Sequence, residues 1–342
     1  MAWSALAMVG GMALAFWLRS SLLSSCSVAV TGAALWLITF TSRARAMVLA
    51  AIIAGLLLGL WRGSAAQLKT ADSRAYIGQT VRISGTVADD VTRRNGATGL
   101  KLKDLHVGRH KLGGEAWASA STGLALKRGD EVTLEGKLKP GFGSFALSLS
   151  YARLVSAERP AHGDVPREVR DDFTAGLDRA VPEPQASLGI GYLTGQHNTL
   201  TPELTKQLQL VGLIHVVIAG GYNVTILARL ARRASMRHSK RLAMVSAGTI
   251  LLGQTLIAGF TAPMARTFVV ASISLMVWYY GRKIHPLVLL PVAAAITAVV
   301  DPSFVWGDVG WYMTFVAYGG LIMLGPMLKQ LFWHGRASGE IK

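Results

Sequence analysis

The sequence has one cysteine, Cys26, among 342 residues, which excludes an intramolecular disulfide and a cysteine-based metal cluster. Charged side chains are also scarce, at 16% of the residues, where a soluble domain has about 25%. Residues 62–206 hold 36 of the 54 charged side chains, which leaves 18 for the other 197 residues. Such long, nearly uncharged stretches exclude a wholly soluble protein.

Long apolar runs lie on both sides of this charged block. A membrane-spanning helix needs about 20 mostly apolar residues, and shorter runs can complete a span by tilting or by local thinning of the bilayer. The predicted spans are Met1–Leu18, Ser27–Phe40, Ala46–Trp61, Gln207–Ala228, Leu242–Phe260, Ala262–Gly281, His285–Val300 and Val309–Leu328. The first run lacks a basic leader, which favours a retained helix over a cleaved signal peptide. Leu188–Thr194 is a candidate re-entrant or interfacial piece.

Basic residues in the short loops predict the orientation of these spans, because Lys and Arg are retained on the cytoplasmic side. The loop Arg229–Arg241 has six cations and no acid. Placing it in the cytoplasm puts Arg282, Lys283 and the C-terminal tail on the same side, and the charged block outside; Arg19 alone disagrees. We therefore expect a multi-pass plasma-membrane protein with that loop and the C-terminus in the cytoplasm.

The charged block has short alternating runs between residues 80 and 155, which predict five strands separated by turns. Their order and lengths favour a small closed OB-like barrel, a fold that often binds oligonucleotides. The candidate phosphate contacts in this outer domain are Arg82, Arg93, Arg94, Lys101, Lys103, Lys127 and Arg128. The alternative is an ordinary solvated surface. We expect the domain's aromatic residues in its core rather than on a stacking surface: Trp117, Phe142, Phe145 and Tyr151.

Polar residues also occur within the apolar C-terminal half, where they are costly and usually face a bundle interior or an aqueous path. The candidates are His215, Gly220, Gly221, Tyr222, Asn223 and Arg266. For His215 and Asn223, the alternative is a hydrogen bond to a neighbouring helix. The glycine pair permits close packing or a helix break. Arg266 either extends to the headgroups or faces the interior and contacts phosphate.

This half of the chain resembles the core of the ComEC family of competence proteins. The order of the elements is similar to that family over essentially the whole chain, including the three leading helices and the OB-like insert. The matching motifs are Gly195–Asn198, Thr201–Leu204, Gly212–His215, Gly220–Asn223, Ala262–Pro263 with Arg266, Gly281–Arg282, Asp301–Pro302 and Asp308–Leu324. The resemblance implies a channel that takes up single-stranded DNA across the bacterial plasma membrane during natural transformation. The family has a serine where this chain has Gly220, and no His-x-His-x-Asp-His nuclease cluster is present.

The fold we expect is a polytopic α-helical membrane protein with an inserted extracytoplasmic OB-like domain. Its predicted parts are N-terminal spans over residues 1–61, the OB-like domain over 72–156, a linker over 157–206 with an amphipathic helix at 167–181 against the outer membrane face, the competence-type helical core over 207–328 and a cytoplasmic tail over 329–342. We expect no enzyme activity, cofactor or metal, because the sequence offers no nucleophile, base and orienter set and no metal-ligand spacing.

The partners implied by the resemblance are single-stranded DNA, the lipid bilayer and other competence proteins: a DNA receptor, a cytoplasmic motor and a separate nuclease, with an oligomer possible. A motor is expected elsewhere because the sequence has no Walker-type Gly-Lys-Ser/Thr loop. Two alternatives remain open. One is a small-solute or lipid transporter on the same bundle, and the other is a truncated structural family member that acts only with a partner subunit.

Overall fold

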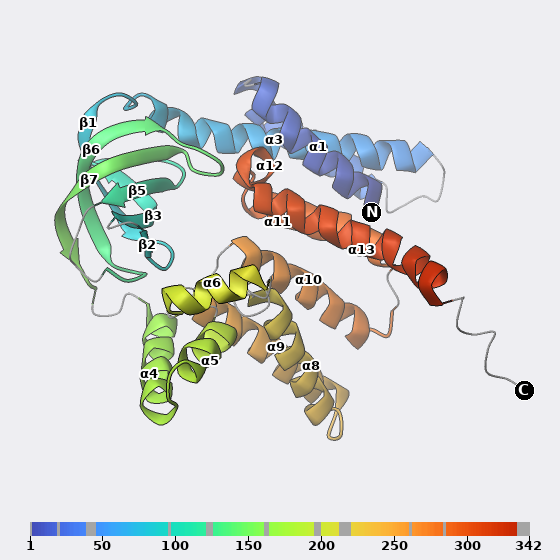
Figure 1. The fold of residues 1–342 in the computed structure, drawn as a ribbon. Coiled ribbons are helices and arrows are strands. Elements are labelled where there is room, and N and C mark those ends of the chain that lie inside the picture. The colour runs from blue at the N-terminus through green and yellow to red at the C-terminus, as the bar shows by residue number, and fades with distance from the viewer. Residues whose placement is uncertain are drawn as a thin grey trace, which may run out of the picture. The chain divides into compact units, whose positions relative to one another are not determined.

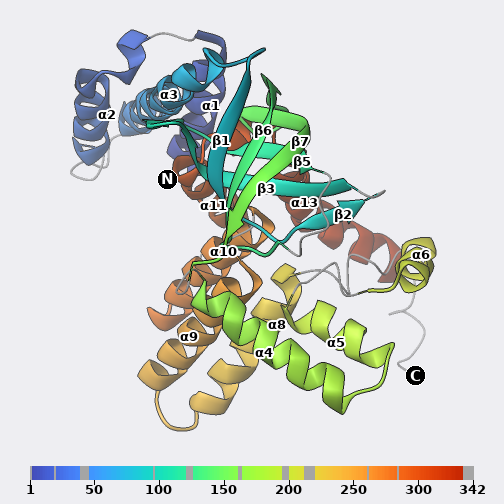
Figure 2. The same ribbon diagram turned by 90° about the vertical axis from the view of Figure 1, so that its left-hand side faces the viewer.

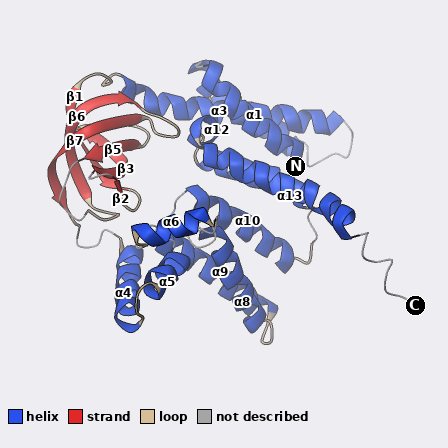
Figure 3. Ribbon diagram, viewed as in Figure 1, coloured by secondary structure: helices blue, strands red, loops and turns tan. Residues whose placement is uncertain are grey.

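The computed structural model describes residues 2–18, 21–38, 46–94, 97–120, 126–160, 164–194, 200–211, 220–259, 262–282 and 285–333. These residues form helices and one β-barrel (Figures 1 and 3). The chain divides into two compact units. The first combines Met1–Ala66 with Arg282–Lys342, and the second is Gln67–Gly281.

Among the described residues, three helical segments are long and apolar enough to span a membrane: Met47–Arg74, Lys240–Ala258 and Val309–Leu328. Four shorter apolar helical segments are Ala2–Leu18, Cys26–Leu37, Pro263–Tyr279 and Leu287–Val300. These seven coincide with seven of the eight predicted spans. The eighth, Gln207–Ala228, is not one continuous helix. Helix α6 (Pro202–Leu210) ends before residues 212–219, which lie outside the described residues, and α8 (Gly220–Ser235) continues past the predicted end.

The first unit contains α1 (Ala2–Leu18), the short 3-10 turn η1 (Ser21–Ser24), α2 (Cys26–Ile38), the first part of α3 (Ala46–Arg74), α11 (Pro286–Val300), α12 (Ser303–Gly307) and α13 (Val309–Trp333). Glycines let α3 pack closely on α1. A Cβ atom on Gly55 or Gly59 would collide with the carbonyl oxygen of Ser4 or Met8. With Gly63 these glycines recur every four residues, a pattern that allows membrane helices to approach closely.

This packing predicts opposite effects for two adjacent glycines of α1. A Cβ at Gly11 would collide with the Leu56 carbonyl oxygen, whereas a Cβ at Gly10 has no atom within 4 Å. We expect Gly11→Ala to lower the free energy of unfolding by about 1–3 kcal/mol through overpacking. Gly10→Ala should be neutral or stabilising, since alanine favours a helix by up to about 1 kcal/mol over glycine. Thermal unfolding of the purified chain in detergent compares them; equal midpoints would contradict the packing.

Side-chain hydrogen bonds fasten the C-terminal helices within the first unit. The Arg62 guanidinium donates to the carbonyl oxygens of Val299 (2.8 Å) and Val300 (3.1 Å), which have no partner within α11 because they lie at its C-terminal end. Trp311 is buried and donates from Nε1 to Thr297 Oγ1 at 3.0 Å. The aromatic start of α13 is therefore held against α11 by a buried polar contact.

The second unit begins with the barrel (Figures 1 and 2), whose strands are β1 (Thr80–Val87), β2 (Thr92–Arg94), β3 (Ala97–Val107), β4 (His110–Lys111), β5 (Ala116–Ala120), β6 (Glu131–Pro140) and β7 (Leu147–Glu158). Five strands pair in the order β1-β6-β7-β5-β3, and the β1–β3 pairing closes the barrel. The pair β5–β7 is parallel and the other pairs are antiparallel. The predicted closed barrel of five strands is confirmed; β2 and β4 are short additions.

The barrel is filled by the side chains that alternate inward along its strands. Ile83, Leu100, Leu102, Leu134 and Leu147 are fully buried in this cluster. Because side chains alternate along a strand, the neighbours of Leu100 and Leu102 on β3 point outward. Lys101 and Lys103 therefore lie on the outer surface. The same alternation puts Trp117 outward on β5.

The helices of this unit are α4 (Val165–Ala180), α5 (Gln185–Thr194), α6, α8, α9 (Lys240–Ala258) and α10 (Ala262–Tyr279). Helix α4 coincides with the predicted amphipathic helix, and α5 includes the predicted re-entrant piece Leu188–Thr194. Thr201 is the N-cap of α6, because its Oγ1 accepts the Leu204 amide. Helix α5 packs on α8 and α9, and Gln254 of α9 donates to the Leu193 carbonyl at the end of α5.

Candidate functional site

The outer face of β3 and β5 carries an aromatic ring beside two lysines. Lys101 and Trp117 are opposite each other in the strand register, and Lys103 is exposed further along β3. Gly99 leaves room for the indole, since a Cβ there would lie 2.7 Å from Trp117 Cζ2. Lys101 also forms an ion pair of 3.1 Å with Glu115.

The loop between β6 and β7 adds two more rings to this face. The Phe142 and Phe145 ring centroids are 5.4 Å apart and lie 6.3 and 5.6 Å from the Trp117 ring. Lys101 Nζ lies 6.0 Å from the Phe145 ring centre. Phe142 is 56% exposed and Trp117 and Phe145 are half-buried. The expectation that these aromatic residues form the core is wrong; Tyr151, at 93% exposed, is also on the surface.

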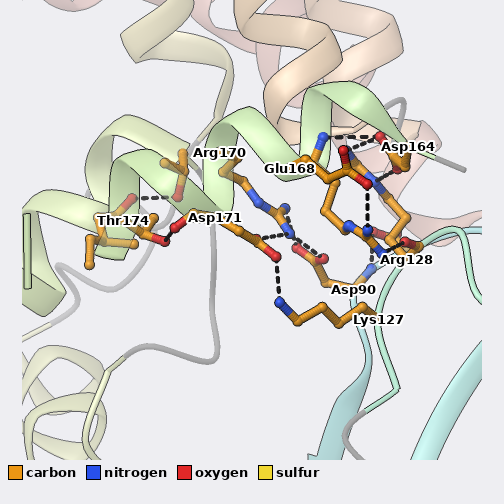
Figure 4. Close-up of polar contacts among 12 residues, drawn as sticks. Asp90, Lys127, Arg128, Asp164, Glu168, Arg170, Asp171 and Thr174 are labelled. Atoms are coloured by element: carbon orange, nitrogen blue, oxygen red, sulfur yellow. Dashed lines mark hydrogen bonds and ion pairs between the residues drawn. The ribbon is translucent and has the colours of Figure 1, made fainter. Parts of the chain in front are cut away.

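The other predicted phosphate contacts are not all placed alike. Arg82 is exposed and pairs with Glu135 at 2.9 Å. Arg93 and Arg94 lie on β2, which pairs with β3, and their side chains lie outside what the structure describes. Lys127 and Arg128 lie instead at the contact between the barrel and α4 (Figure 4).

Acidic side chains neutralise both residues at that contact. Lys127 Nζ lies 2.6 Å from Asp171 Oδ2, and Arg128 donates to both oxygens of Asp164 at 2.6 and 3.2 Å. Arg128 is almost wholly buried, and its Nη2 also reaches the Leu256 carbonyl oxygen of α9 at 3.4 Å. The charges of Lys127 and Arg128 therefore join α4 and α9 to the barrel. The sequence signal that could have indicated this is the row of acids from Asp164 to Asp172.

Further ion pairs extend this contact along α4. Arg170 of α4 donates to both oxygens of Asp90 at 2.8 and 2.9 Å. Arg167 of α4 lies 3.6 Å from Asp130 Oδ1, and both oxygens of Asp130 also accept from Arg159, just beyond β7, at 2.8 Å. Figure 4 shows Arg170 reaching from α4 to Asp90 beside the Lys127–Asp171 pair. We call these pairs, with Arg128–Asp164, the α4 clamp. Bidentate arginine–carboxylate pairs fix both partners' orientation, so the clamp sets how α4 lies on the barrel.

The electrostatics of the clamp follow from its hydrogen bonds. Burial raises the pKa of the Asp130 carboxyl, but bonds from Arg159 and the Lys127 amide outweigh burial, so the pKa of Asp130 lies below its usual value. Burial likewise opposes ionisation of Asp164, and the bonds from Arg128 and the Arg167 amide lower its pKa overall. The carboxylates are therefore stabilised in their charged form.

These shifts predict an acid-labile clamp. A carboxyl whose folded pKa is lowered stabilises the fold fully above its unfolded pKa, about 3.9 for Asp, and this contribution is lost as the pH falls through the folded pKa. We expect the protection of the α4 amides against hydrogen exchange, taken relative to the intrinsic rate at each pH, to stay constant between pH 5 and 7 and to fall below about pH 4. Asp130→Asn should weaken the acid response. An unchanged response in that variant would contradict the assignment.

The predicted residues of the helical core are partly described. Gly220, Gly221, Tyr222 and Asn223 form the first turn of α8, but their surroundings lie outside what the structure describes, as does His215 entirely. The next residue, Val224, is buried with Leu251 of α9 and Met264 of α10. This cluster brings the start of α8 to the start of α10.

Arg266 lies in the second turn of α10, two residues beyond that cluster. Its side chain is only 5% exposed, although it is charged and lies in an apolar helix. A buried arginine in such a helix is costly and is usually retained for a function. Burial within the protein favours the interpretation that Arg266 faces the helix bundle over the one in which it extends to lipid headgroups. Within the described ranges, no group of three His, Cys, Asp or Glu side chains could hold a metal ion.

A comparison with known protein families gives a match in this part of the chain. Residues 192–341 match the family model described as Competence protein. Neither the curated proteins nor the solved structures gave a significant match. The matched range includes α8, α9, α10 and Arg266, and it extends through α13. The resemblance drawn from the sequence motifs is thereby confirmed: the chain contains a competence-family domain of the ComEC type.

Proposed function

We propose that the chain is a component of a plasma-membrane channel that takes up single-stranded DNA during natural transformation. The observation that carries this proposal is the competence-family match over residues 192–341, which contains the buried Arg266 of α10. A guanidinium held among helices presents a planar fork of donors suited to phosphate oxygens. Arg266, with His215 and Asn223 as further candidates, is proposed to line the path of the strand.

Membrane insertion is supported by the three candidate spans and four shorter apolar helices. We propose the orientation that retains the basic turn between α8 and α9 in the cytoplasm and places the barrel outside. Helix α4 has an exposed apolar row of Val165, Val169 and Phe173 opposite its clamp residues, which suits the outer membrane surface. DNA receptor, motor and nuclease functions are proposed for separate proteins.

The barrel is proposed to be OB-like and to receive the strand. Its closed order and the parallel β5–β7 pair support this assignment. OB folds bind oligonucleotides on the face of their second and third strands and on the loop between the fourth and fifth. Counting only the five barrel strands, that face is β3–β5 and that loop is 141–146, where Trp117, Phe142 and Phe145 gather with Lys101. Rings that stack on bases beside a cation are typical of single-strand binding surfaces.

This assignment predicts that Phe142→Ala weakens binding of oligothymidylate. Stacking of a base on an aromatic side chain contributes about 1–3 kcal/mol, so the dissociation constant should rise roughly five- to a hundredfold. The ring is exposed, so its loss should leave the fold intact. Fluorescence anisotropy of a labelled oligonucleotide with the purified chain in detergent measures the affinity.

Tyr151→Ala is the matched control, because it removes another exposed ring of the same barrel that lies on β7 outside the aromatic cluster. Its affinity should equal that of the unaltered chain. If both variants bind equally well, or both lose affinity equally, the β3–β5 face is not the binding surface.

A further inference from the structure

The core helices have a second surface that the proposed strand path does not use. Residues 204–300 contain no Asp or Glu. Within this range, exposed cations gather at the C-terminal end of α8 and the start of α9. We call this surface the basic end and define it by Arg229, Arg233, Arg237, Lys240 and Arg241. None of these side chains forms an ion pair with a carboxylate among the described residues.

Contacts between the three helices bring the basic end together. Arg232 of α8 lies with its Cζ 4.7 Å from the Trp278 ring centre of α10. Lys240 Nζ lies 5.8 Å from the same ring and 5.5 Å from the Tyr279 ring. Ser246 donates to Ser235 at 2.8 Å, which ties α9 to the end of α8. The cations therefore form one surface around the aromatic end of α10.

Two of these cations lie where their charge destabilises the helix that carries them. Lys240 and Arg241 occupy the first turn of α9. The N-terminal end of a helix has a partial positive charge, so cations there are unfavourable and anions are favourable. Ser239 caps this end through a 3.0 Å bond from the Leu242 amide, but it does not neutralise the charge. An external anion would offset the repulsion.

Apolar side chains are interleaved with the cations. Leu230, Met236, Leu242 and Tyr280 are all exposed at the basic end. Helix α8 carries Arg229, Arg232 and Arg233 in its last turns, and it is not among the apolar helices. A basic helix with exposed apolar residues, next to Trp and Tyr at the end of a membrane helix, is typical of the bilayer interface.

The same arrangement is less suited to single-stranded DNA. A strand would need free ring faces for its bases. Arg232 and Lys240 already lie over the Trp278 and Tyr279 rings. Phosphate groups without bases match the cations, and acyl chains match the apolar residues between them.

We propose that the basic end binds the headgroup phosphates of anionic lipids, such as phosphatidylglycerol, in the cytoplasmic leaflet. This site rests on the membrane insertion and orientation given under Proposed function. The anionic leaflet attracts basic segments close to its surface. The bound lipids would fix the depth of α8 and α9 in the bilayer.

The test uses the full chain reconstituted in phosphatidylcholine bilayers with a trace of spin-labelled phosphatidylglycerol or phosphatidylcholine. Electron paramagnetic resonance gives the ratio of their association constants. We expect the unaltered chain to prefer phosphatidylglycerol, and the preference to fall roughly fivefold for each cation removed in Arg233→Gln, Arg237→Gln and Lys240→Gln. Raising the salt to about 1 M, where the Debye length is about 3 Å, should weaken the preference without any substitution.

The matched control removes the same charge from the barrel through Arg109→Gln, Lys137→Gln and Lys139→Gln, all exposed side chains outside the aromatic face. It should keep the lipid preference. Equal losses in both triple variants, or no preference in the unaltered chain, would overturn the proposal. So would a basic-end variant that keeps its lipid preference but binds oligothymidylate more weakly, because the surface would then be a nucleic-acid site. DNA uptake in cells is measured separately, so failure of the channel proposal would not be mistaken for failure of this one.

Discussion

Asp164→Ala is expected to lower the free energy of unfolding by about 3–5 kcal/mol, because it leaves the Arg128 guanidinium buried without its carboxylate. The two side chains are 6% and 17% exposed, so water cannot replace the lost partner. Asp164 also caps α4 by accepting the Arg167 amide at 3.0 Å, which adds to the loss. Denaturant unfolding of the purified chain in detergent measures the effect.

A double-mutant cycle separates the ion pair from the cap. Arg128→Met removes the charge that Asp164→Ala leaves unpaired, so the double variant should be more stable than the sum of the single losses predicts. Glu135→Ala is the control, since it breaks the exposed pair with Arg82 and should cost less than about 1 kcal/mol. Additive losses in the cycle, or a control that costs as much as Asp164→Ala, would contradict a buried clamp.

Local patterns predicted the barrel and several helices because these depend on side chains near one another in the sequence. Apolar residues at every second position, such as Val81 and Ile83 or Leu100 and Leu102, predict strands with one buried face. The Thr201-Pro202 pair is typical of a helix start, and Thr201 is the N-cap of α6 in the structure. The spacing of Gly55, Gly59 and Gly63 can be recognised in the sequence alone, so it could have predicted the close packing of α3 on another helix.

Long-range pairing could not be predicted in the same way. Asp90 and Arg170 are 80 residues apart, and the sequence around each residue does not indicate that the two form a pair. The sequence therefore offered Lys127 and Arg128 as phosphate contacts, although both pair with acids of α4. Trp117, Phe142 and Phe145 were expected in the core because aromatic residues usually are, yet aliphatic side chains already fill this small barrel. Only the closure of the barrel shows that these rings have to lie outside.

The channel proposal predicts a large effect for the buried arginine of α10. A hydrogen bond to a charged group contributes about 1.5–3 kcal/mol, so Arg266→Ala should reduce DNA uptake roughly ten- to a hundredfold if that contact limits passage. Arg266→Lys keeps the charge but loses the planar fork, so its uptake should lie between those of alanine and arginine. Arg82→Ala, which removes an exposed and already paired cation, should leave uptake nearly unchanged.

The most direct measurement is the uptake of labelled DNA, together with the yield of transformants, in the native cell after deletion of the gene. The account predicts that labelled DNA remains outside the plasma membrane and transformants disappear, and that the unaltered chain restores both while Arg266→Ala and His215→Ala restore them only in part. Normal uptake in the deletion strain would contradict the channel function outright. Full restoration by both variants would contradict the roles given to Arg266 and His215 in lining the path.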